Sequence, residues 1–179
     1  MTLLDGTALK PTVWETDPMT FTTARLCDAH AHDMHFHIAE PLFKPYGAKP
    51  IFRGRITTLK VFEDHGQIKT ILQEKAEGRV LVVDGGGSHR CALIDAELAK
   101  LAVANGWQGL VVYGCVRDTA ELIELPIGIR ALHAHPLQSH QKNFGDRDLP
   151  VFFAGVHFKK DHFIYADHDG IVVSDKMLS

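Results

Sequence analysis

An arginine and two carboxylates follow an apolar stretch in the sequence GLVVYGCVRDTAEL, which spans residues 109–122. Arg117 and Asp118 are adjacent, and Glu121 lies shortly after them. An arginine offers a planar pair of donors to a carboxylate, and an aspartate offers oxygen to a hard divalent cation. The pair therefore suits a small 2-keto acid chelated to a metal ion. The alternative is a surface ion pair at a helix start, with Asp118 as the N-cap and Glu121 as the acid of a capping box.

A run of glycines supplies a second candidate site. The sequence VVDGGGS, residues 82–88, leaves a predicted buried strand and is expected to enter a helix. The N–H groups of Gly85, Gly86 and Gly87 are candidates for a cradle around a carboxylate or phosphate. A tight turn is the alternative. The run lacks the spacing of dinucleotide and nucleoside triphosphate motifs, and it resembles the first glycine motif of methyltransferases without the acidic residue expected at the end of the next strand.

Four closely spaced histidines form a third candidate, in the sequence DAHAHDMHFH. They are His30, His32, His35 and His37. The H-x-H pattern is familiar from the first strand of amidohydrolase barrels, but such a barrel needs about 250 residues. We therefore expect a solvated or partly packed segment, with incidental affinity for nickel or zinc.

The first two candidates must be positioned by a strand–helix–strand unit. The pattern predicts a buried strand over residues 80–83 and another over residues 110–113, with an amphipathic helix between them. The apolar side of the helix and its glycine C-cap are formed by Ile94, Leu98, Leu101, Ala102 and Gly106. Such a unit should be parallel and right-handed. Because parallel strands end at the same edge of a sheet, we expect the glycine run and Arg117 to converge there.

The rest of the chain adds further elements to an α/β fold with a mixed or antiparallel β component. Residues 1–19 look irregular, and we expect one domain over residues 1–179. Helices are predicted over residues 22–31 and 66–78, and strands within residues 53–63, 128–136, 151–158 and 162–174, the last with a hairpin turn at residues 168–170.

Composition narrows the classes of function. The chain has 179 residues, of which 45% are hydrophobic and 23% charged, and a net charge of −3. It has no basic run, which disfavours direct binding of nucleic acid, and no apolar stretch of membrane-spanning length. No signal peptide is read at the N-terminus. Cys27, Cys91 and Cys115 form no C-x-x-C pair, which indicates reduced thiols and a cytoplasmic protein.

Several segments resemble the family of the regulator of ribonuclease activity A, which includes class II 4-hydroxy-4-methyl-2-oxoglutarate aldolases. These segments are GRVLVVDGGGSHRCALIDAELAKLAVANGWQGLVVYGCVRD, ELPIGIRALHAHP, YADHDGIVVS, EPLFKPYG and KVFEDHG. The resemblance covers about residues 22–175. It implies a β/β/α swivelling-domain sandwich, similar to phosphohistidine domains, with a central βαβ unit. It also implies a ring-shaped homotrimer with clefts between subunits, and it removes the methyltransferase interpretation.

The resemblance implies roles for the candidate residues. Arg117 would bind the carboxylate and keto oxygen of the substrate, and Asp118 would hold Mg²⁺ or Mn²⁺. The segment Asp95, Ala96, Glu97 and Leu98 corresponds to the substrate-binding backbone of the family. The implied activity is metal-dependent cleavage of 4-hydroxy-4-methyl-2-oxoglutarate to pyruvate, together with oxaloacetate decarboxylation, since both reactions pass through the pyruvate enolate.

The residues depart from the aldolase pattern at one position. The aldolase branch carries an acid 21 residues before the arginine, which is Ala96 in this chain, although its neighbours Asp95 and Glu97 are acidic. The resemblance therefore leaves an alternative function open. In it, the chain is a regulator that binds the scaffold region of the endoribonuclease RNase E and inhibits it.

Overall fold

A computed structural model describes residues 21–179, and the irregular segment predicted for residues 1–19 lies outside them. The helices are α1 Thr23–His30, α2 Gly66–Leu72, α3 Ala96–Ala104 and α4 Thr119–Leu122. The strands are β1 Phe36–Ile38, β2 Lys44–Pro45, β3 Phe52–Lys60, β4 Val80–Asp84, β5 Ala92–Ile94, β6 Gly109–Val116, β7 Gly128–Ala134, β8 Asp146–Arg147, β9 Val151–Phe153, β10 Val156–Phe158, β11 Phe163–Ala166 and β12 Ile171–Ser174. In this described part of the chain, no helix has the length and apolar character needed to span a membrane.

Four parallel strands form the centre of the large sheet, in the order β3, β4, β6 and β7. Every residue of β4 is buried, and so are all residues of β6 except the half-buried Tyr113. Burial on both faces explains why these strands are continuous apolar runs without alternation. The predicted βαβ unit is β4, α3 and β6, and its two strands are parallel as predicted. Antiparallel strands extend the sheet, with β11, β12 and β1 beyond β3 and β2 beyond β7.

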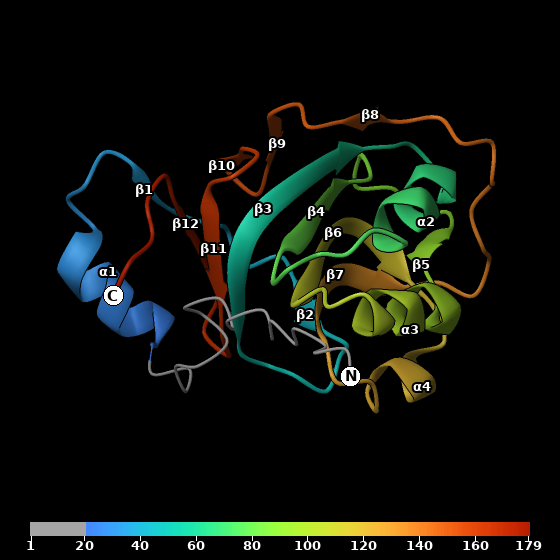
Figure 1. Cartoon of the computed structure of the whole chain (residues 1–179), viewed down its shortest axis with the longest axis horizontal. Coiled ribbons are helices and arrows are strands. Elements are labelled where there is room, and N and C mark those ends of the chain that lie inside the picture. The colour runs from blue at the N-terminus through green and yellow to red at the C-terminus, as the bar shows by residue number, and fades with distance from the viewer. Residues whose placement is uncertain (1–20) are drawn as a thin grey trace, which may run out of the picture.

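Each face of the central strands carries its own apolar layer, because successive strand residues point to opposite sides. Leu81 and Val83 of β4 pack with side chains of α2 and α3. Val80 and Val82 pack instead with β9, β10, β11 and β12. Figure 1 shows α2, α3 and α4 to the right of the central strands, β10, β11 and β12 to their left, and β9 above them. This is the predicted β/β/α arrangement, so the α/β fold class is confirmed.

Two facing glycines allow an aromatic ring to pack closely against the parallel strands. Gly109 of β6 lies directly opposite Gly128 of β7. The ring of Phe52 from β3 is fully buried, and a Cβ atom added at either glycine would overlap that ring. The ring therefore occupies the space that two absent side chains leave.

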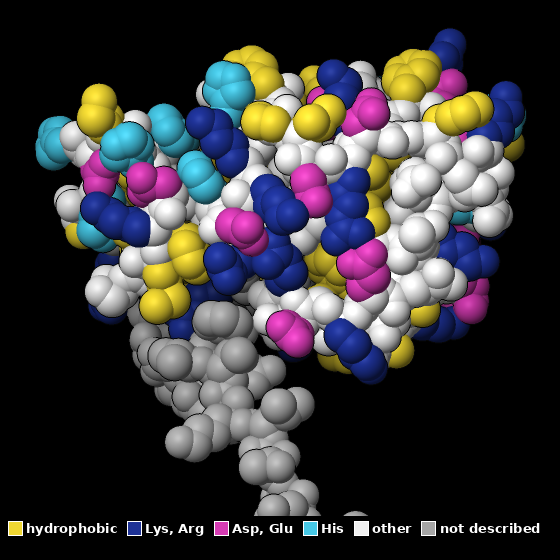
Figure 2. Space-filling view, turned by 45° about the horizontal axis from the view of Figure 1, so that its top comes forward, with side chains coloured by type: hydrophobic (Ala, Val, Ile, Leu, Met, Phe, Trp, Pro, Cys, Tyr) yellow, Lys and Arg dark blue, Asp and Glu magenta, His cyan; other side chains and the backbone are white. Residues whose placement is uncertain are grey.

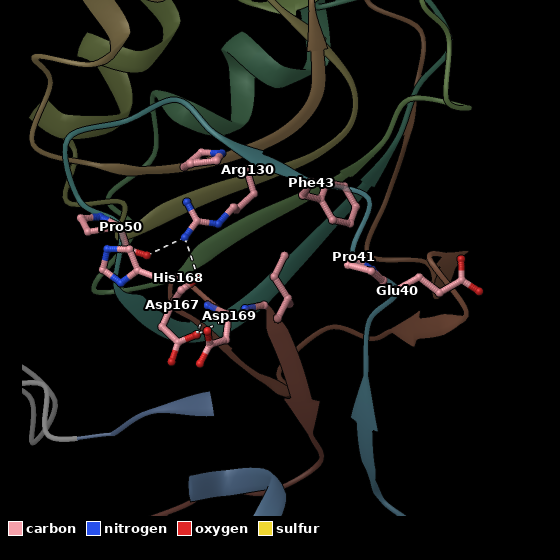
Figure 3. A pocket seen from close by; sticks show the side chains of 11 residues that line it. Glu40, Pro41, Phe43, Pro50, Arg130, Asp167, His168 and Asp169 are labelled. Atoms are coloured by element: carbon pink, nitrogen blue, oxygen red, sulfur yellow. Dashed lines mark hydrogen bonds between the residues drawn. The ribbon is translucent and has the colours of Figure 1, made fainter. Parts of the chain in front are cut away.

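The buried Arg130 joins three separate segments. Its Nη2 donates to the carbonyl oxygen of Pro50 at 2.6 Å and to that of Asp167 at 2.9 Å, as Figure 3 shows. Burial lowers the pKa of the guanidinium, and the nearby Asp167 partly offsets this effect. These residues border a cavity of about 250 Å³ that Phe43 and His168 also line. Arg130 thus connects β7 to the loop at Pro50 and to the turn between β11 and β12.

Two buried carboxylates hold turns by accepting several hydrogen bonds each. Asp167 accepts from the backbone N–H of Thr23 at 2.6 Å and from its hydroxyl at 2.7 Å. The remaining donors to Asp167 are the N–H groups of Asp169 and Gly170, and those to Asp64 are the N–H groups of Gly66, Lys142, Asn143 and Phe144. Burial alone would raise the pKa of each carboxyl, but the hydrogen bonds outweigh it and lower both pKa values.

Two predicted elements differ from the observed ones. The helix predicted over residues 66–78 is the shorter α2, and Gly78, with a φ of 82°, lies in the turn that precedes β4. Residues 151–158 form a hairpin, β9 and β10, rather than one strand. Its turn residues Ala154 and Gly155 have φ values of 51° and 71°, as a tight hairpin turn of this length requires.

We predict that Asp167→Asn destabilises the fold at neutral pH. The carboxylate holds α1 to the β11–β12 turn, and its loss should lower the free energy of unfolding by about 2 kcal/mol at pH 7. Because folding lowers the pKa of Asp167, its contribution is present above the unfolded pKa and is lost as pH falls through the folded pKa. The difference between the parent and the variant should therefore shrink below about pH 4. Denaturant unfolding of the parent and the variant, at pH 7 and below about pH 4, measures this difference, with Asp169→Asn as the control. Equal stabilities of parent and variant at pH 7 would refute the prediction.

Candidate active site

Strand β6 positions Arg117 at the edge of the sheet where the parallel strands end. It extends to Val116 and passes through Gly114, so it is longer than the predicted strand. It pairs first with β4 and then with β5, where Ile94 lies opposite Val116. The N–H of Arg117 donates to the carbonyl oxygen of Ile94 at 2.9 Å. Arg117 therefore follows the end of a parallel strand directly, whereas the predicted strand ends at residue 113.

The helix that follows the glycine run starts later than predicted. Strand β5 lies between the two, and α3 begins at Ala96. Ile94 is consequently a strand residue and not part of the apolar side of the helix. Asp95 caps the helix, because its Oδ1 accepts from the N–H of Leu98 at 2.8 Å. The predicted C-terminal glycine is confirmed, since Gly106 follows the C-cap with a φ of 81°.

The glycine run forms a tight turn whose N–H groups are already bonded within the chain. Gly85 and Gly87 both donate to the carbonyl oxygen of Tyr113 at 3.1 Å. Gly86 donates to the Asp84 carboxylate at 2.9 Å. An anion cradle needs free donors, so this geometry argues against the cradle and fits the tight turn.

The glycine turn and the arginine do not converge as expected. The turn is fixed at Tyr113, and β6 continues from there for the rest of its length before Arg117. At about 3.3 Å per strand residue, four residues separate the two by about 13 Å. The additional pairing of β6 with β5 produces this separation.

Asp118 has a left-handed backbone and binds the start of α3. Its φ is 59°, and its side chain makes no capping hydrogen bond to α4. Oδ2 instead accepts from the N–H of Ala96 at 3.1 Å and lies 3.9 Å from Nε of Arg117. Glu121 lies 3.1 Å from Nζ of Lys100. Asp118 thus holds the N-cap position of α4, as the alternative predicted, but no capping box forms, because its side chain binds the start of α3 rather than its own helix.

The Arg117 guanidinium makes a single hydrogen bond within residues 21–179. Its Nη1 donates to the carbonyl oxygen of Pro136 at 3.4 Å, whereas its buried Nε has no hydrogen-bond partner within residues 21–179. The side chain is 30% exposed, so the guanidinium is reachable from solvent. The adjoining cavity, of about 250 Å³, is lined by Arg117, Asp118, Thr119, Ala134, His135 and Pro136. A partly exposed guanidinium at an open cavity is the arrangement expected for binding a carboxylate or a keto oxygen.

The two acids that flank Ala96 have different roles. Asp95 is 8% exposed, and both of its oxygens are used, since Oδ2 accepts from Nε2 of Gln138 at 2.9 Å. The Glu97 side chain is 82% exposed and pairs with Lys100 at 3.0 Å. The Ala96 side chain itself is buried. Asp95 therefore maintains the helix start, and Glu97 is a solvated surface acid.

The carboxylate of Asp118 suits an open magnesium or manganese site, which water and substrate complete. It does not suit a closed site made of protein ligands alone. Within residues 21–179, no group of three or more His, Cys, Asp or Glu side chains is arranged to hold a metal. Mg²⁺ commonly keeps several waters and takes one or two carboxylates together with oxygens of the substrate. The half-exposed Asp118, beside an open cavity, matches that mode of binding.

The four histidines behave as the sequence suggested. His30 packs against Phe36 with ring centroids 6.0 Å apart, and His35 lies 3.6 Å from Asp175. Figure 2 shows histidine side chains gathered toward the end of the molecule that carries α1 and β1. The segment is partly packed and partly solvated.

Sequence reasoning missed the contribution of β7 to the cavity. His135 and Pro136 directly follow this strand, which is parallel to β6 and ends at the same edge. The N–H of His135 donates to the carbonyl oxygen of Val116 at 2.9 Å. The rule that ligands bind where parallel strands end could have identified this histidine.

Proteins similar to this chain carry two kinds of name. A protein of Methylococcus capsulatus is 59% identical over 89% of this chain and 99% of its own length, and one of Aromatoleum aromaticum is 51% identical over the same shares. Both are provisionally named 4-hydroxy-4-methyl-2-oxoglutarate aldolase. A solved structure from Thermus thermophilis, described as the RNA-processing inhibitor RraA, is 40% identical with a TM-score of 0.86. The match covers 90% of this chain and 96% of that one.

A further solved structure, from Geobacillus kaustophilus, is described as an S-adenosylmethionine:2-dimethylmenaquinone methyltransferase. It is 40% identical over 88% of this chain and 97% of its own, with a TM-score of 0.85. The RraA-like family, described as Aldolase/RraA, matches residues 23–173 of this chain. This match spans the parallel strands, α3, Arg117 and Asp118. The chain therefore belongs to the RraA-like family.

Proposed function

We propose that the protein is a divalent-metal-dependent carbon–carbon lyase that acts on small 2-keto diacids. The observation that carries this proposal is the placement of Arg117 and Asp118 side by side at one open cavity, with side chains that are 30% and 38% exposed. The aldolase names of the relatives support the same class of reaction. The proposed substrates are 4-hydroxy-4-methyl-2-oxoglutarate and oxaloacetate, both of which yield pyruvate.

The residues of the chain position the substrate and the ion. Arg117 donates to the carboxylate and the keto oxygen of the substrate, and its place is set by its backbone bond to Ile94. Asp118 holds the ion, and its carboxylate is oriented by the N–H of Ala96. Bound Mg²⁺ or Mn²⁺ supplies positive charge that stabilises an enolate. Pro136 accepts from Arg117 and keeps the guanidinium at the edge of the cavity.

We propose that decarboxylation of oxaloacetate is the stronger of the two reactions. Aldol cleavage requires a group that accepts the proton of the departing hydroxyl, whereas decarboxylation does not. Ala96 occupies the position of the family acid, and Asp95 has both oxygens engaged. Glu97 points into solvent and pairs with Lys100. The described residues at the site therefore supply charge stabilisation but lack a positioned proton acceptor.

We further propose that the protein works in the cytoplasm as a homotrimer. Large apolar side chains are exposed on loops and on the β9–β10 hairpin, including Phe62, Phe144 and Phe152. Contact between subunits would remove such surface from water. Sedimentation equilibrium measures the mass, and a monomer of 19.9 kDa at micromolar concentration would contradict the trimer.

A second function is favoured by the Thermus thermophilis structure, which is described as an RNA-processing inhibitor. In this proposal the protein binds the scaffold region of RNase E and inhibits the nuclease. The net charge of −3 suits a basic partner segment, so binding should weaken as salt rises. A pull-down of the RNase E scaffold at low and high salt tests this function, and the absence of association at low salt excludes it.

We predict that Asp118→Asn removes metal-stimulated decarboxylation. Asparagine keeps an oxygen for the N–H of Ala96 but loses the charge that holds the ion, so pyruvate release from oxaloacetate with Mg²⁺ should fall by at least about 100-fold. Thermal unfolding should stay close to that of the parent. Glu121→Gln is the control, since it breaks only the pair with Lys100. An active parent that the Asp118→Asn change leaves unaffected would show that the site is not used.

We also predict that Ala96→Asp raises aldol cleavage more than decarboxylation. The new carboxylate stands at the first position of α3, where a helix N-terminus favours negative charge. A positioned base contributes about 100-fold or more to a step that needs proton transfer. Pyruvate release from 4-hydroxy-4-methyl-2-oxoglutarate and from oxaloacetate, measured side by side, gives the ratio. An equal change in both rates would mean that proton acceptance does not limit the cleavage.

A further inference from the structure

His135 lies beside Arg117 in the same cavity. The two residues follow neighbouring parallel strands, and the N–H of His135 donates to the carbonyl oxygen of Val116 at 2.9 Å. Pro136, the next residue, accepts from Nη1 of Arg117 at 3.4 Å. Backbones of paired strands lie about 4.8 Å apart. A ligand held by Arg117 is therefore within reach of the His135 side chain, which also lines the cavity.

A backbone hydrogen bond sets which nitrogen of His135 carries the proton. Nδ1 accepts from the N–H of Leu137 at 3.1 Å, which requires a lone pair on Nδ1. In the neutral ring the proton then resides on Nε2. His135 consequently offers a ligand one N–H donor at Nε2, and it is not arranged to accept a proton from the substrate.

A keto diacid needs a second donor that Arg117 does not supply. Arg117 is committed to the first carboxylate and the keto oxygen, and Asp118 repels any further negative charge. Besides Arg117, the side-chain donors that line this cavity are the hydroxyl of Thr119 and Nε2 of His135. A hydrogen bond from imidazole to a carboxylate is charge-assisted and stronger than one between neutral groups.

We propose that His135 is the specificity-determining residue of the site, and that its Nε2–H binds the distal carboxylate of a 2-keto diacid. This inference rests on the proposed lyase function. It makes His135 the group that distinguishes oxaloacetate, which has two carboxylates, from pyruvate, which has one. The product therefore loses a contact that the substrate has, and its release is favoured.

The test compares His135→Phe, which keeps a ring but removes the donor, with His135→Gln, which restores an N–H. We expect His135→Phe to raise KM for oxaloacetate about tenfold, as loss of a hydrogen bond to a charged group would, and to leave inhibition by pyruvate unchanged. His135→Gln should recover most of the loss. His133→Phe is the matched control, because His133 lies on β7, the strand that His135 follows, contacts Lys44 and His89, and does not line the cavity.

Binding without turnover gives an independent measurement. Calorimetry of the Mg²⁺-loaded parent should show malate binding about tenfold more tightly than lactate, and His135→Phe should abolish this preference. Nitrogen NMR of the imidazole should place the tautomeric proton on Nε2.

The possible failures are distinguishable. If the parent turns over oxaloacetate and His135→Phe keeps the parent KM and the preference for malate, His135 does not bind the distal carboxylate. If the parent neither turns over oxaloacetate nor binds malate or pyruvate, the lyase function fails and this inference fails with it.

Discussion

The parallel pairing of β6 with strands on both of its sides is the constraint on which the site depends. β4 and β7 fix its first half, and β5 and β7 fix its second half. Because β5 leads directly into α3, the same pairing places the first residues of α3 next to Arg117 and Asp118. The βαβ connection thus brings a helix N-terminus and a strand end together without any long-range loop.

The backbone conformation of Asp118 also positions the site. The left-handed backbone of Asp118 directs its carboxylate toward Ala96 instead of toward the N–H groups of its own helix. Aspartate tolerates this conformation better than most residues do, because its short side chain can form local hydrogen bonds. One residue thereby links the end of β6 to the start of α3 and still presents an oxygen at the cavity. The site is consequently built from adjoining segments of one rigid unit, as accurate positioning of a substrate requires.

The sequence predicted the features that depend on local pattern. Continuous apolar runs identified β4 and β6, and Gly106 identified the end of α3, because burial and capping act on neighbouring residues. It did not predict β5, which is three residues long and adjoins an amphipathic helix of similar composition. It also could not predict that Asp118 binds the N–H of Ala96, since that contact depends on how β6 pairs with β5. Likewise, it could not predict that the N–H groups of Gly85 and Gly87 donate to a carbonyl oxygen on another strand, which argues against the predicted anion cradle.

The close packing of Phe52 against Gly109 and Gly128 has a consequence for how this family can diverge. A larger residue at either glycine would displace the ring, and a smaller residue in place of Phe52 would leave a cavity between the strands. Each single change is thus deleterious, whereas a compensated combination is tolerable, which is the condition for strong epistasis. We expect these three positions to be inherited together in lineages that keep the pairing of β6 with β7. We also expect chimeras that exchange one of these strands without the others to fold poorly.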